Sequence, residues 1–313
     1  MPTDQAPSTD LGRVGVWGHL DSLSIDRARA YAVRVEALGY GALWVPETVG
    51  REPFTLLALL AGATSSLRLG TSIASIWGHD AQTTRMAAET LDEAAGGRFV
   101  LGLGVSHQHL AQKLRGHVYE RPLTRMREFL AAYRAAPYKG PRHGPSGGGG
   151  PPVLLAALRE RMLDLAASEA DGAFPYLVTA ARVAWARDRL DTAAAAAGRP
   201  RPTLAVTLPV VLEVDPARAR DAARGYLGPY LRTPAYRAAW SAQGFGAADW
   251  EQPGSDGLVD AMVAWGAVPE LLARVAAFHA AGADHVALIP LDPAGVTEHL
   301  PTLEALAEVG LTA

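Results

Sequence analysis

Short apolar runs alternate with longer amphipathic segments along almost the whole chain. The apolar runs cover residues 13–17, 41–46, 67–73, 98–105, 152–157, 172–176, 203–214 and 285–290. Helical patterns lie between or after them, at residues 24–38, 53–63, 82–95, 122–135, 160–169, 180–197 and about 300–309. Strands that are buried on both faces read as continuous apolar runs, and helical crossovers make neighbouring strands parallel. The alternation therefore predicts an α/β fold built from repeated βα units.

The number of strands decides between two architectures. Eight strands with helical crossovers predict a single (β/α)8 TIM barrel over residues 11–313, although 313 residues would also suit two domains. The first four strands begin at residues 13, 41, 67 and 98, which is one βα unit each. The steps from residue 98 to 152 and from 203 to 285 are longer, so we expect insertions after strands 4 and 7. A doubly wound open sheet is the alternative, but eight units without a switch in pattern favour a closed barrel.

Three segments stand apart from the repeating units. Residues 1–10 have the composition of a disordered lead, and residues 138–152 (YKGPRHGPSGGGGPP) are rich enough in Gly and Pro to predict a flexible loop. Residues 215–266 fall inside the second long connection and are rich in aromatic residues and glycine. We expect this segment to be an insertion, or a lid over the mouth of the barrel.

Composition excludes several classes of function. The chain has no cysteine, which excludes disulfide scaffolds, zinc–cysteine sites, iron–sulfur clusters and thiol catalysis. Its formal net charge of −3 argues against a nucleic-acid partner, which requires a basic face. No run of 18 apolar residues and no signal-peptide pattern occurs, so we expect a cytoplasmic protein with no membrane partner.

Histidines follow several predicted strands, at the barrel face where active sites are found. His107-Gln108-His109 follows the fourth strand and resembles a metal-binding H-x-H motif, which Asp292 could complete after the last strand. Metal barrels usually place that motif after the first strand, so a metal hydrolase is an alternative rather than the main hypothesis. His19 and His79 follow the first and third strands and are further candidates for proton transfer.

Several strand motifs together resemble a known family. They are Gly41–Glu47 (GALWVPE), Leu69–Ile73 (LGTSI), Gly96–Gly104 (GGRFVLGLG), Val153–Ala157 and Ala170–Ala173 (ADGA). In their order and spacing the chain resembles the bacterial luciferase-like monooxygenases, and within them the actinobacterial branch that uses coenzyme F420, a deazaflavin. The resemblance implies a barrel that holds F420 at its mouth, with FMN as the alternative cofactor. It also implies a homodimer and a small-molecule substrate, with a reductase that regenerates the reduced cofactor as a candidate partner.

The resemblance also implies roles for individual residues. Glu47 falls near the cofactor ring, and a bulge with a non-proline cis peptide is expected at Ser72-Ile73 or one residue later, at Ala74. Val105, Ser106 and His107 fall where relatives line the cofactor cleft. The end of the fifth strand, at Ala156, Ala157, Leu158 and Arg159, falls where relatives hold the cofactor phosphate. Trp17 and Tyr176 are candidate walls for the flat ring, as are Trp44, Ile73 and Trp77.

Two departures from the family narrow the expected function. Thr48 stands where the sugar-phosphate dehydrogenases of the superfamily have a histidine, and His107 stands where they have a glutamate acid. Oxidation of a sugar phosphate is therefore not expected, and His107, then His19, are the candidate proton donors beside Glu47. We predict hydride transfer between F420 and a small organic substrate. The alternatives are an FMNH2-dependent monooxygenase, a barrel that binds a ligand without redox chemistry, and a metal hydrolase.

Overall fold

The computed structural model describes residues 10–143, 150–293 and 300–312. The expected disordered lead, at residues 1–9, and the centre of the expected Gly/Pro loop, at residues 144–149, lie outside the described residues. Eight parallel strands form a ring in the order β1-β2-β3-β5-β6-β7-β8-β10, and β10 pairs with both β8 and β1. The ring is closed, which confirms the (β/α)8 barrel and excludes the open doubly wound sheet.

The ring contains all eight predicted strands, with small differences at their ends. Its members are β1 (Val14–Trp17), β2 (Ala42–Val45), β3 (Arg68–Thr71), β5 (Phe99–Gly104), β6 (Val153–Leu155), β7 (Gly172–Ala173), β8 (Thr203–Leu212) and β10 (His285–Leu291). Two short strands were not predicted, namely β4 (Ala74–Ser75) and β9 (Ala264–Gly266). β4 pairs with the end of β5, and β9 pairs with residues 210–212 of β8, beyond the point where β8 leaves β7.

The seven predicted helices are present, and their ends lie within two residues of the predicted ones. They are α1 (Ile25–Ala37), α2 (Pro53–Ala61), α3 (Ala81–Ala94), α4 (Pro122–Ala135), α5 (Glu160–Glu169), α6 (Ala180–Ala196) and α11 (Leu300–Glu308). Local contacts set the two ends of α1: at its start the Ser24 hydroxyl accepts a hydrogen bond from Arg27 N, and after its end Gly39 adopts a φ of +81°. The prediction missed α7 (Pro216–Leu227), α8 (Pro234–Ser241), α9 (Asp256–Met262) and α10 (Val268–Ala280).

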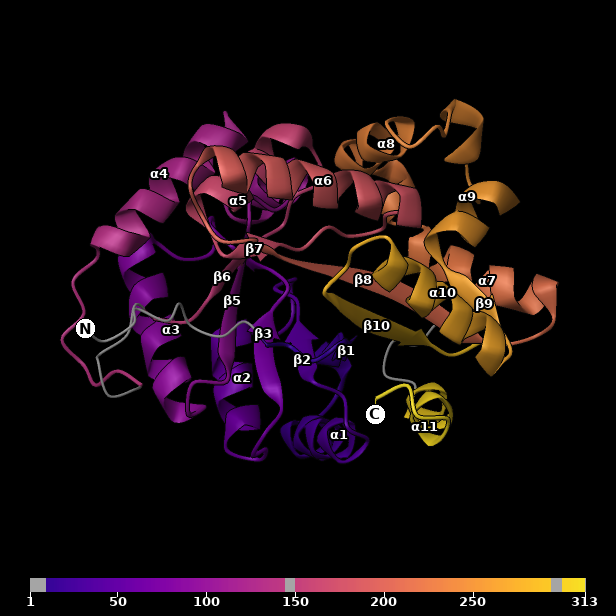
Figure 1. Cartoon of the computed structure of the whole chain (residues 1–313), viewed down its shortest axis with the longest axis horizontal. Coiled ribbons are helices and arrows are strands. Elements are labelled where there is room, and N and C mark those ends of the chain that lie inside the picture. The colour runs from indigo at the N-terminus through magenta and orange to yellow at the C-terminus, as the bar shows by residue number, and fades with distance from the viewer. Residues whose placement is uncertain (1–9, 144–149, 294–299, 313) are drawn as a thin grey trace.

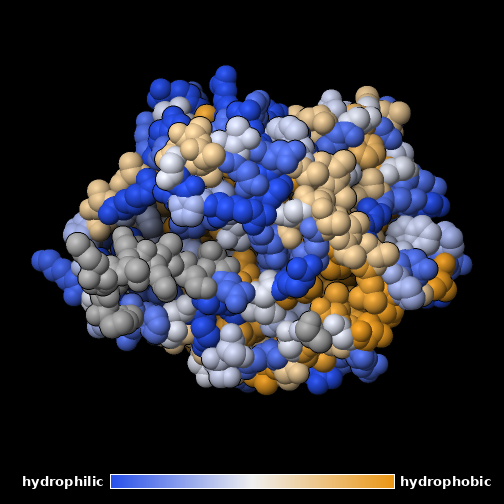
Figure 2. Space-filling view, in the orientation of Figure 1, coloured by the Kyte–Doolittle hydropathy of each residue, from blue (hydrophilic) through white to orange (hydrophobic). Residues whose placement is uncertain are grey.

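Helices surround the strands, and the long excursion between β8 and β10, at residues 213–284, lies at one side of the barrel. In Figure 1, α8 and α9 lie on the opposite side of the molecule from α2 and α3, while α11 lies beside α1. An ion pair between Arg34 and Glu304 joins α1 to α11. In Figure 2, hydrophilic side chains dominate over α6, whereas a hydrophobic area is visible between α10 and α11. No helix in the part of the chain that the structure describes has the length and apolar character needed to cross a membrane.

The interior of the barrel is packed around one tryptophan. Trp44 is fully buried, and glycine leaves room for it, because a Cβ at Gly70 would lie 2.2 Å from Trp44 Cζ3. Its indole donates a hydrogen bond of 3.0 Å to Nε2 of His285, whose Nδ1 lies 2.7 Å from the carbonyl oxygen of Gly12. This pattern fixes a neutral His285 with its proton on Nδ1, and burial lowers the pKa of His285 to about 4. Trp44 is therefore a core residue and not a wall of the cofactor site.

Candidate functional site

A cavity of about 1130 Å³ opens at the carboxyl ends of the strands. Its walls come from the loops after β1, β2, β3, β5, β6 and β7, and from residues 229–236 of the excursion, which follow α7 and include the start of α8. Active sites of such barrels lie at this face. The volume exceeds the range of about 300–1000 Å³ that is common for single ligand pockets, so the cavity is large enough for a large ligand.

The cavity brings together the residues that were expected to bind a cofactor or to act in catalysis. Those that line it are Trp17, His19, Glu47, Ser72, Ile73, Val105, Ser106, His107, Ala156, Ala157, Leu158, Arg159 and Tyr176. Ala74 does not line it, because this residue belongs to β4 and is buried against Leu103 of β5. Trp77 lies behind the wall, where its indole donates a hydrogen bond to the carbonyl oxygen of Val105.

One wall of the cavity is formed by the bulge after β3. The peptide bond between Ser72 and Ile73 is cis, as the resemblance led us to expect. The Trp17 indole donates a hydrogen bond of 3.2 Å to the carbonyl oxygen of Ser72. Gly104 lies directly behind the bulge, since a Cβ there would approach Ile73 Cδ1 to 2.6 Å. The bulge is thus held from both sides by neighbouring strands and offers an apolar surface to a flat ligand.

Glu47 belongs to the cavity wall, but its carboxylate is already engaged. One oxygen accepts a hydrogen bond of 2.8 Å from Ser75 N, and the other forms an ion pair with Arg115. The side chain is only 5% exposed. Burial raises the pKa of Glu47, against the opposing effects of the Ser75 amide and Arg115. Glu47 therefore connects β2 to β4 and to the helical turn Leu110–Leu114. Sequence reasoning missed Arg115, because nothing in the local sequence around Arg115 links it to a residue 68 positions earlier.

His19 stands at the cavity with a carboxylate and a hydroxyl beside it. Its Nε2 lies 3.7 Å from Asp21 Oδ2 and 3.4 Å from Thr48 Oγ1. The Thr48 hydroxyl donates a hydrogen bond of 2.7 Å to the same Asp21 oxygen, and Asp21 also accepts from the Arg51 amide. A carboxylate this close orients the imidazole, and an imidazole can give or take a proton. The group His19, Thr48 and Asp21 is therefore suited to hold and deliver a proton.

His107 has a different environment. Its ring is stacked on that of His109, with centroids 6.0 Å apart, and lies 5.3 Å from the ring of Tyr236. Burial, with a smaller contribution from His109, lowers the pKa of His107 to about 4, so the ring is neutral near pH 7. Among the residues that the structure describes, no three His, Asp or Glu side chains are grouped so that they could hold a metal ion, and Asp292 does not join the two histidines.

Arginines gather at the mouth of the cavity, beside the first turns of two helices. Arg121 precedes α4, and Arg159 and Arg161 flank the start of α5; all three are exposed and line the cavity. None of the three forms an ion pair with a carboxylate of a described residue, and no side chain caps either helix. Free amides and the helix dipole favour anions at such ends, and arginine binds phosphate and carboxylate. This rim is suited to a ligand with negative charge.

Tyrosines form the wall nearest the excursion, and sequence reasoning identified only one of them. Tyr176 follows β7, while Tyr230 and Tyr236 come from residues 229–236 and also line the cavity. Tyr226, at the end of α7, lies behind them and bonds to Tyr176 through its hydroxyl. The sequence prediction for residues 215–266 was an insertion or a lid, and it did not show which of its aromatic residues meet Tyr176.

Non-glycine residues with positive φ occur around the same cavity. Among the described residues they are Ser106, Arg121 and Leu177, with φ values of 53°, 44° and 55°. Ser106 and Arg121 line the cavity, and Leu177 follows Tyr176 directly. Such conformations cost about 1–3 kcal/mol each and are concentrated at functional sites. Their distribution supports this cavity as the functional site.

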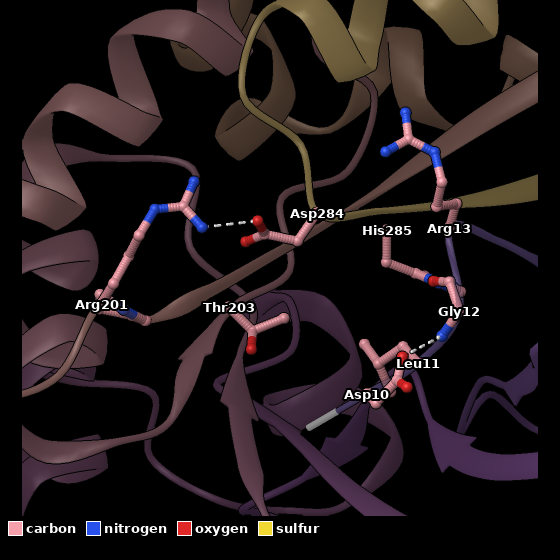
Figure 3. A pocket seen from close by; sticks show the side chains of 9 residues that line it. Asp10, Leu11, Gly12, Arg13, Arg201, Thr203, Asp284 and His285 are labelled. Carbon is pink, nitrogen blue, oxygen red and sulfur yellow. Dashed lines mark hydrogen bonds and ion pairs between the residues drawn. The ribbon is translucent and has the colours of Figure 1, made fainter. Parts of the chain in front are cut away.

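A second, smaller pocket of about 340 Å³ lies at the amino ends of the strands (Figure 3). It is lined by residues of the segments that enter β1, β8 and β10. Two of its charged lining residues pair within the fold: Asp284 pairs with Arg201 at 2.7 Å, and also with Arg187 at 3.3 Å. At this end of a TIM barrel such contacts stabilise the fold rather than serve catalysis.

Comparison with known proteins agrees with this geometry. The sequence profile of the luciferase-like monooxygenase family matches residues 8–285. A 5,10-methylenetetrahydromethanopterin reductase of Archaeoglobus fulgidus is 28% identical over 209 residues, which is 62% of this chain and 63% of the reductase. The chain spans 28 to 63% of the length of the first curated relatives that it matches.

Solved structures share the fold across almost the whole chain. An F420-dependent secondary alcohol dehydrogenase, solved with an F420–acetone adduct, superimposes with a TM-score of 0.76 at 14% identity, covering 96% of this chain and 98% of that one. The oxygenating constituent of 3,6-diketocamphane monooxygenase from Pseudomonas putida, solved with FMN, gives a TM-score of 0.70 at 16% identity, with coverages of 95% and 96%. At these identities the likeness shows the fold alone.

Proposed function

Because the chain belongs to the luciferase-like monooxygenase family, whose members are oxidoreductases or monooxygenases, we propose that it is an F420-dependent oxidoreductase. It would transfer hydride between the deazaflavin and a small organic substrate. The relatives and structural neighbours include both F420-dependent and FMN-binding proteins, so the cofactor is a deazaflavin or a flavin. The choice of F420 within that pair is the proposal.

The arginine rim is the observation that carries this choice. F420 bears a phosphodiester and a glutamate tail with further carboxylates, whereas FMN bears one phosphate group. Three arginines that pair with no carboxylate of a described residue, at two uncapped helix starts, match a ligand with several negative charges better than one with a single phosphate. The residues present therefore fit F420: the bulge at Ser72 and Ile73 would lie against the ring, and the rim would hold the charged tail.

The proton is assigned to His19 rather than to His107. When bound, the deazaflavin gives or takes one hydride, which is two electrons and a hydrogen nucleus. A carbonyl carbon that gains the hydride leaves an oxygen that needs one proton, and oxidation of an alcohol needs the reverse. His19, with Asp21 beside it, is placed to give and regain that proton. His107 is neutral near pH 7 because burial lowers its pKa to about 4, so it carries no proton to donate from an imidazolium form.

Cofactor titration tests the proposal. The fluorescence of F420 is followed as the purified protein is added, and FMN is titrated in the same way. F420 is expected to bind more tightly than FMN. The double variant Arg159→Ala/Arg161→Ala should weaken F420 binding by about 10-fold or more, since a hydrogen bond to a charged group contributes about 1.5–3 kcal/mol. The matched control is Arg27→Ala, which removes an exposed arginine of α1 outside the cavity.

The outcomes separate the competing functions. Tight binding of FMN without binding of F420 would favour the FMNH2-dependent monooxygenase, for which oxygen consumption is the next measurement. Binding of neither would overturn the oxidoreductase proposal. Loss of turnover in His19→Gln with retained F420 binding would support the proton assignment. Loss of turnover in His107→Gln with normal turnover in His19→Gln would assign the proton to His107 instead.

Three further expectations remain proposals. A homodimer is tested by light scattering on the purified chain. A partner reductase is tested by adding a cofactor-reducing enzyme and comparing turnover with and without it. Cytoplasmic location, which follows from the sequence expectations alone, is tested by fractionation of the producing cells.

A further inference from the structure

A cluster of tyrosine rings forms a wall of the cavity, and apart from Tyr176, a candidate wall for the cofactor ring, none of them has a role in the cofactor or proton assignment. The rings of Tyr176, Tyr230 and Tyr236 lie within 6.0 Å of one another, measured between centroids. Tyr226 joins the cluster from α7, with its ring 5.6 Å from that of Tyr230. Trp240 of α8 packs behind Tyr236 at 5.8 Å and is fully buried. These contacts fix the rings, so the wall is a defined surface rather than a set of independent side chains.

The hydroxyl groups of this tyrosine wall meet at one place. Tyr176 Oη is hydrogen-bonded to Tyr226 Oη, and it lies 2.9 Å from Tyr230 Oη. Each hydroxyl can both donate and accept, so the group can turn a donor toward an oxygen atom of a bound molecule. Burial raises the pKa of all these tyrosines, which keeps them protonated and uncharged. The wall therefore offers an uncharged hydrogen-bonding point within an aromatic surface.

None of the described residues that line this side of the cavity is charged, so an ionic ligand would find no partner of opposite charge there. The described lining residues of this side are Trp17, Phe174, Tyr176, Pro229, Tyr230, Thr233, Ala235 and Tyr236. The charged lining residues are Glu47, which is paired with Arg115, and those at the starts of α4 and α5. Transfer of an unpaired charge into an apolar surface is strongly unfavourable, whereas a carbonyl or hydroxyl group needs only a hydrogen bond. The wall thus favours an uncharged ligand.

Trp17 joins the tyrosine wall to the place assigned to the cofactor ring. Its ring centroid lies 6.0 Å from that of Tyr176, while its indole nitrogen bonds to the carbonyl oxygen of Ser72 in the bulge. His19 is next to it, with ring centroids 6.2 Å apart. A molecule bound at the tyrosine wall would therefore lie beside both the bulge and the proposed proton donor.

We propose that the tyrosine wall is the substrate subsite, and that it selects an uncharged, mainly apolar ketone or alcohol. The Tyr176 and Tyr230 hydroxyls would bind the single oxygen of that molecule, with Tyr226 behind them bonded to Tyr176, and the rings of Trp17 and Tyr236 would cover its carbon skeleton. The assignment of this ligand as the hydride partner rests on the proposed function. Recognition of the ligand does not, because it depends only on side chains of this chain.

A pair of probes that differ in charge tests the subsite. Acetophenone and 4-acetylbenzoate carry the same ketone, but the second adds a carboxylate. Binding is measured by ligand-observed saturation-transfer NMR on the full chain, with and without F420, so no turnover is required. Acetophenone is expected to bind at least 10-fold more tightly than 4-acetylbenzoate. Tyr230→Phe should weaken acetophenone binding by about 2- to 10-fold, since one hydrogen bond contributes about 0.5–1.5 kcal/mol.

The control variant is Tyr138→Phe, which removes a phenol hydroxyl outside the cavity and should leave acetophenone binding unchanged. Far-ultraviolet circular dichroism shows whether each variant is folded. Equal binding of the two probes, no binding of acetophenone, or equal affinities in Tyr230→Phe and the parent would overturn the subsite. If F420 binds and these results are negative, the subsite alone fails. If F420 does not bind but acetophenone does, with the Tyr230→Phe effect, the proposed function fails and the subsite stands.

Discussion

His285 makes the stability of the barrel depend on pH, although it lies far from the candidate site. It is fully buried at the start of β10, where it accepts a hydrogen bond from the Trp44 indole and bonds through Nδ1 to the Gly12 carbonyl oxygen. Both ring nitrogens are engaged only when the imidazole is neutral. A second proton would remove the acceptor for Trp44 and place a charge in the barrel core. The native protein therefore resists protonation of this residue more than the unfolded chain does.

The magnitude follows from the two pKa values. The pKa is about 4 in the folded protein against 6.5 for an ordinary histidine, so the unfolded chain binds the proton first as the pH falls. The stability from neutral His285 is present above about pH 6.5 and is lost as the pH falls toward 4. One pKa unit corresponds to about 1.4 kcal/mol, so the full loss is about 3 kcal/mol, of which about 2 kcal/mol falls between pH 7 and pH 5. For a chain of this length 2 kcal/mol corresponds to a fall of about 3 °C in unfolding temperature.

The assay compares variants, because other groups titrate over the same range. Unfolding temperatures are measured by calorimetry at pH 7 and pH 5 for the parent, for His285→Gln and for His117→Gln. Glutamine can accept from Trp44 without titrating, so His285→Gln should lose about 3 °C less than the parent between the two pH values. His117 is exposed, and its replacement should leave the difference unchanged. If His285→Gln and the parent lose the same number of degrees, the buried neutral imidazole is not the cause and the reasoning is refuted.

Three further substitutions test the packing around the candidate site. Glu47→Gln removes the carboxylate that pairs with Arg115. Since the Arg115 side chain is still 27% exposed and can be solvated, the free energy of unfolding measured by calorimetry should fall by only about 1–3 kcal/mol. An unchanged free energy of unfolding would show that the pair is not structural. Gly70→Ala places a Cβ 2.2 Å from Trp44 Cζ3, and a denaturant titration should show a free energy of unfolding lower by about 1–3 kcal/mol. The same substitution should lower it less in a protein that already carries Trp44→Leu, because the clashing ring is then absent. Ser106→Val should unfold at least 2 °C below Ser106→Gly, since a β-branched residue does not tolerate a φ of +53°, and equal temperatures would contradict the strained conformation.

The residues at the strand ends could be predicted because a simple rule places them. Parallel strands of a barrel all end at one face, so Trp17, Glu47, Ser106 and Ala156 had to lie close together once the strands were recognised. The cis peptide at Ser72-Ile73 came from the family resemblance and not from the residues themselves. Ala74 shows the limit of the rule, because β4 turns its side chain into the core one residue after the bulge.

Only part of the fold between β8 and β10 was beyond local patterns. Helices α8 and α9 have eight and seven residues and β9 has three, so each is too short for a sustained periodic pattern, whereas α7 and α10, with 12 and 13 residues, are amphipathic helices that the sequence prediction overlooked. Their positions depend on β8, which leaves β7 after residue 204 and pairs with β9 at residues 210–212. This is a tertiary contact between segments about 50 residues apart, and local patterns carry no information on it. Arg115 escaped prediction for the same reason, since its partner Glu47 lies on another unit.

The candidate site has two parts, one made of residues at the strand ends and the other made of residues from the excursion, which include most of the tyrosine wall. Residues at strand ends are fixed by the barrel, whatever substrate is used, and under the proposed function they would serve the cofactor. Tyr226, Tyr230 and Tyr236 are placed instead by the excursion, which can change in sequence and length without disturbing the ring of strands. Substrate choice is free to reside there because the barrel does not depend on it. If this is correct, Tyr230→Phe changes which ketone is bound while F420 affinity and barrel stability stay the same, whereas Arg159→Ala/Arg161→Ala has the opposite pattern.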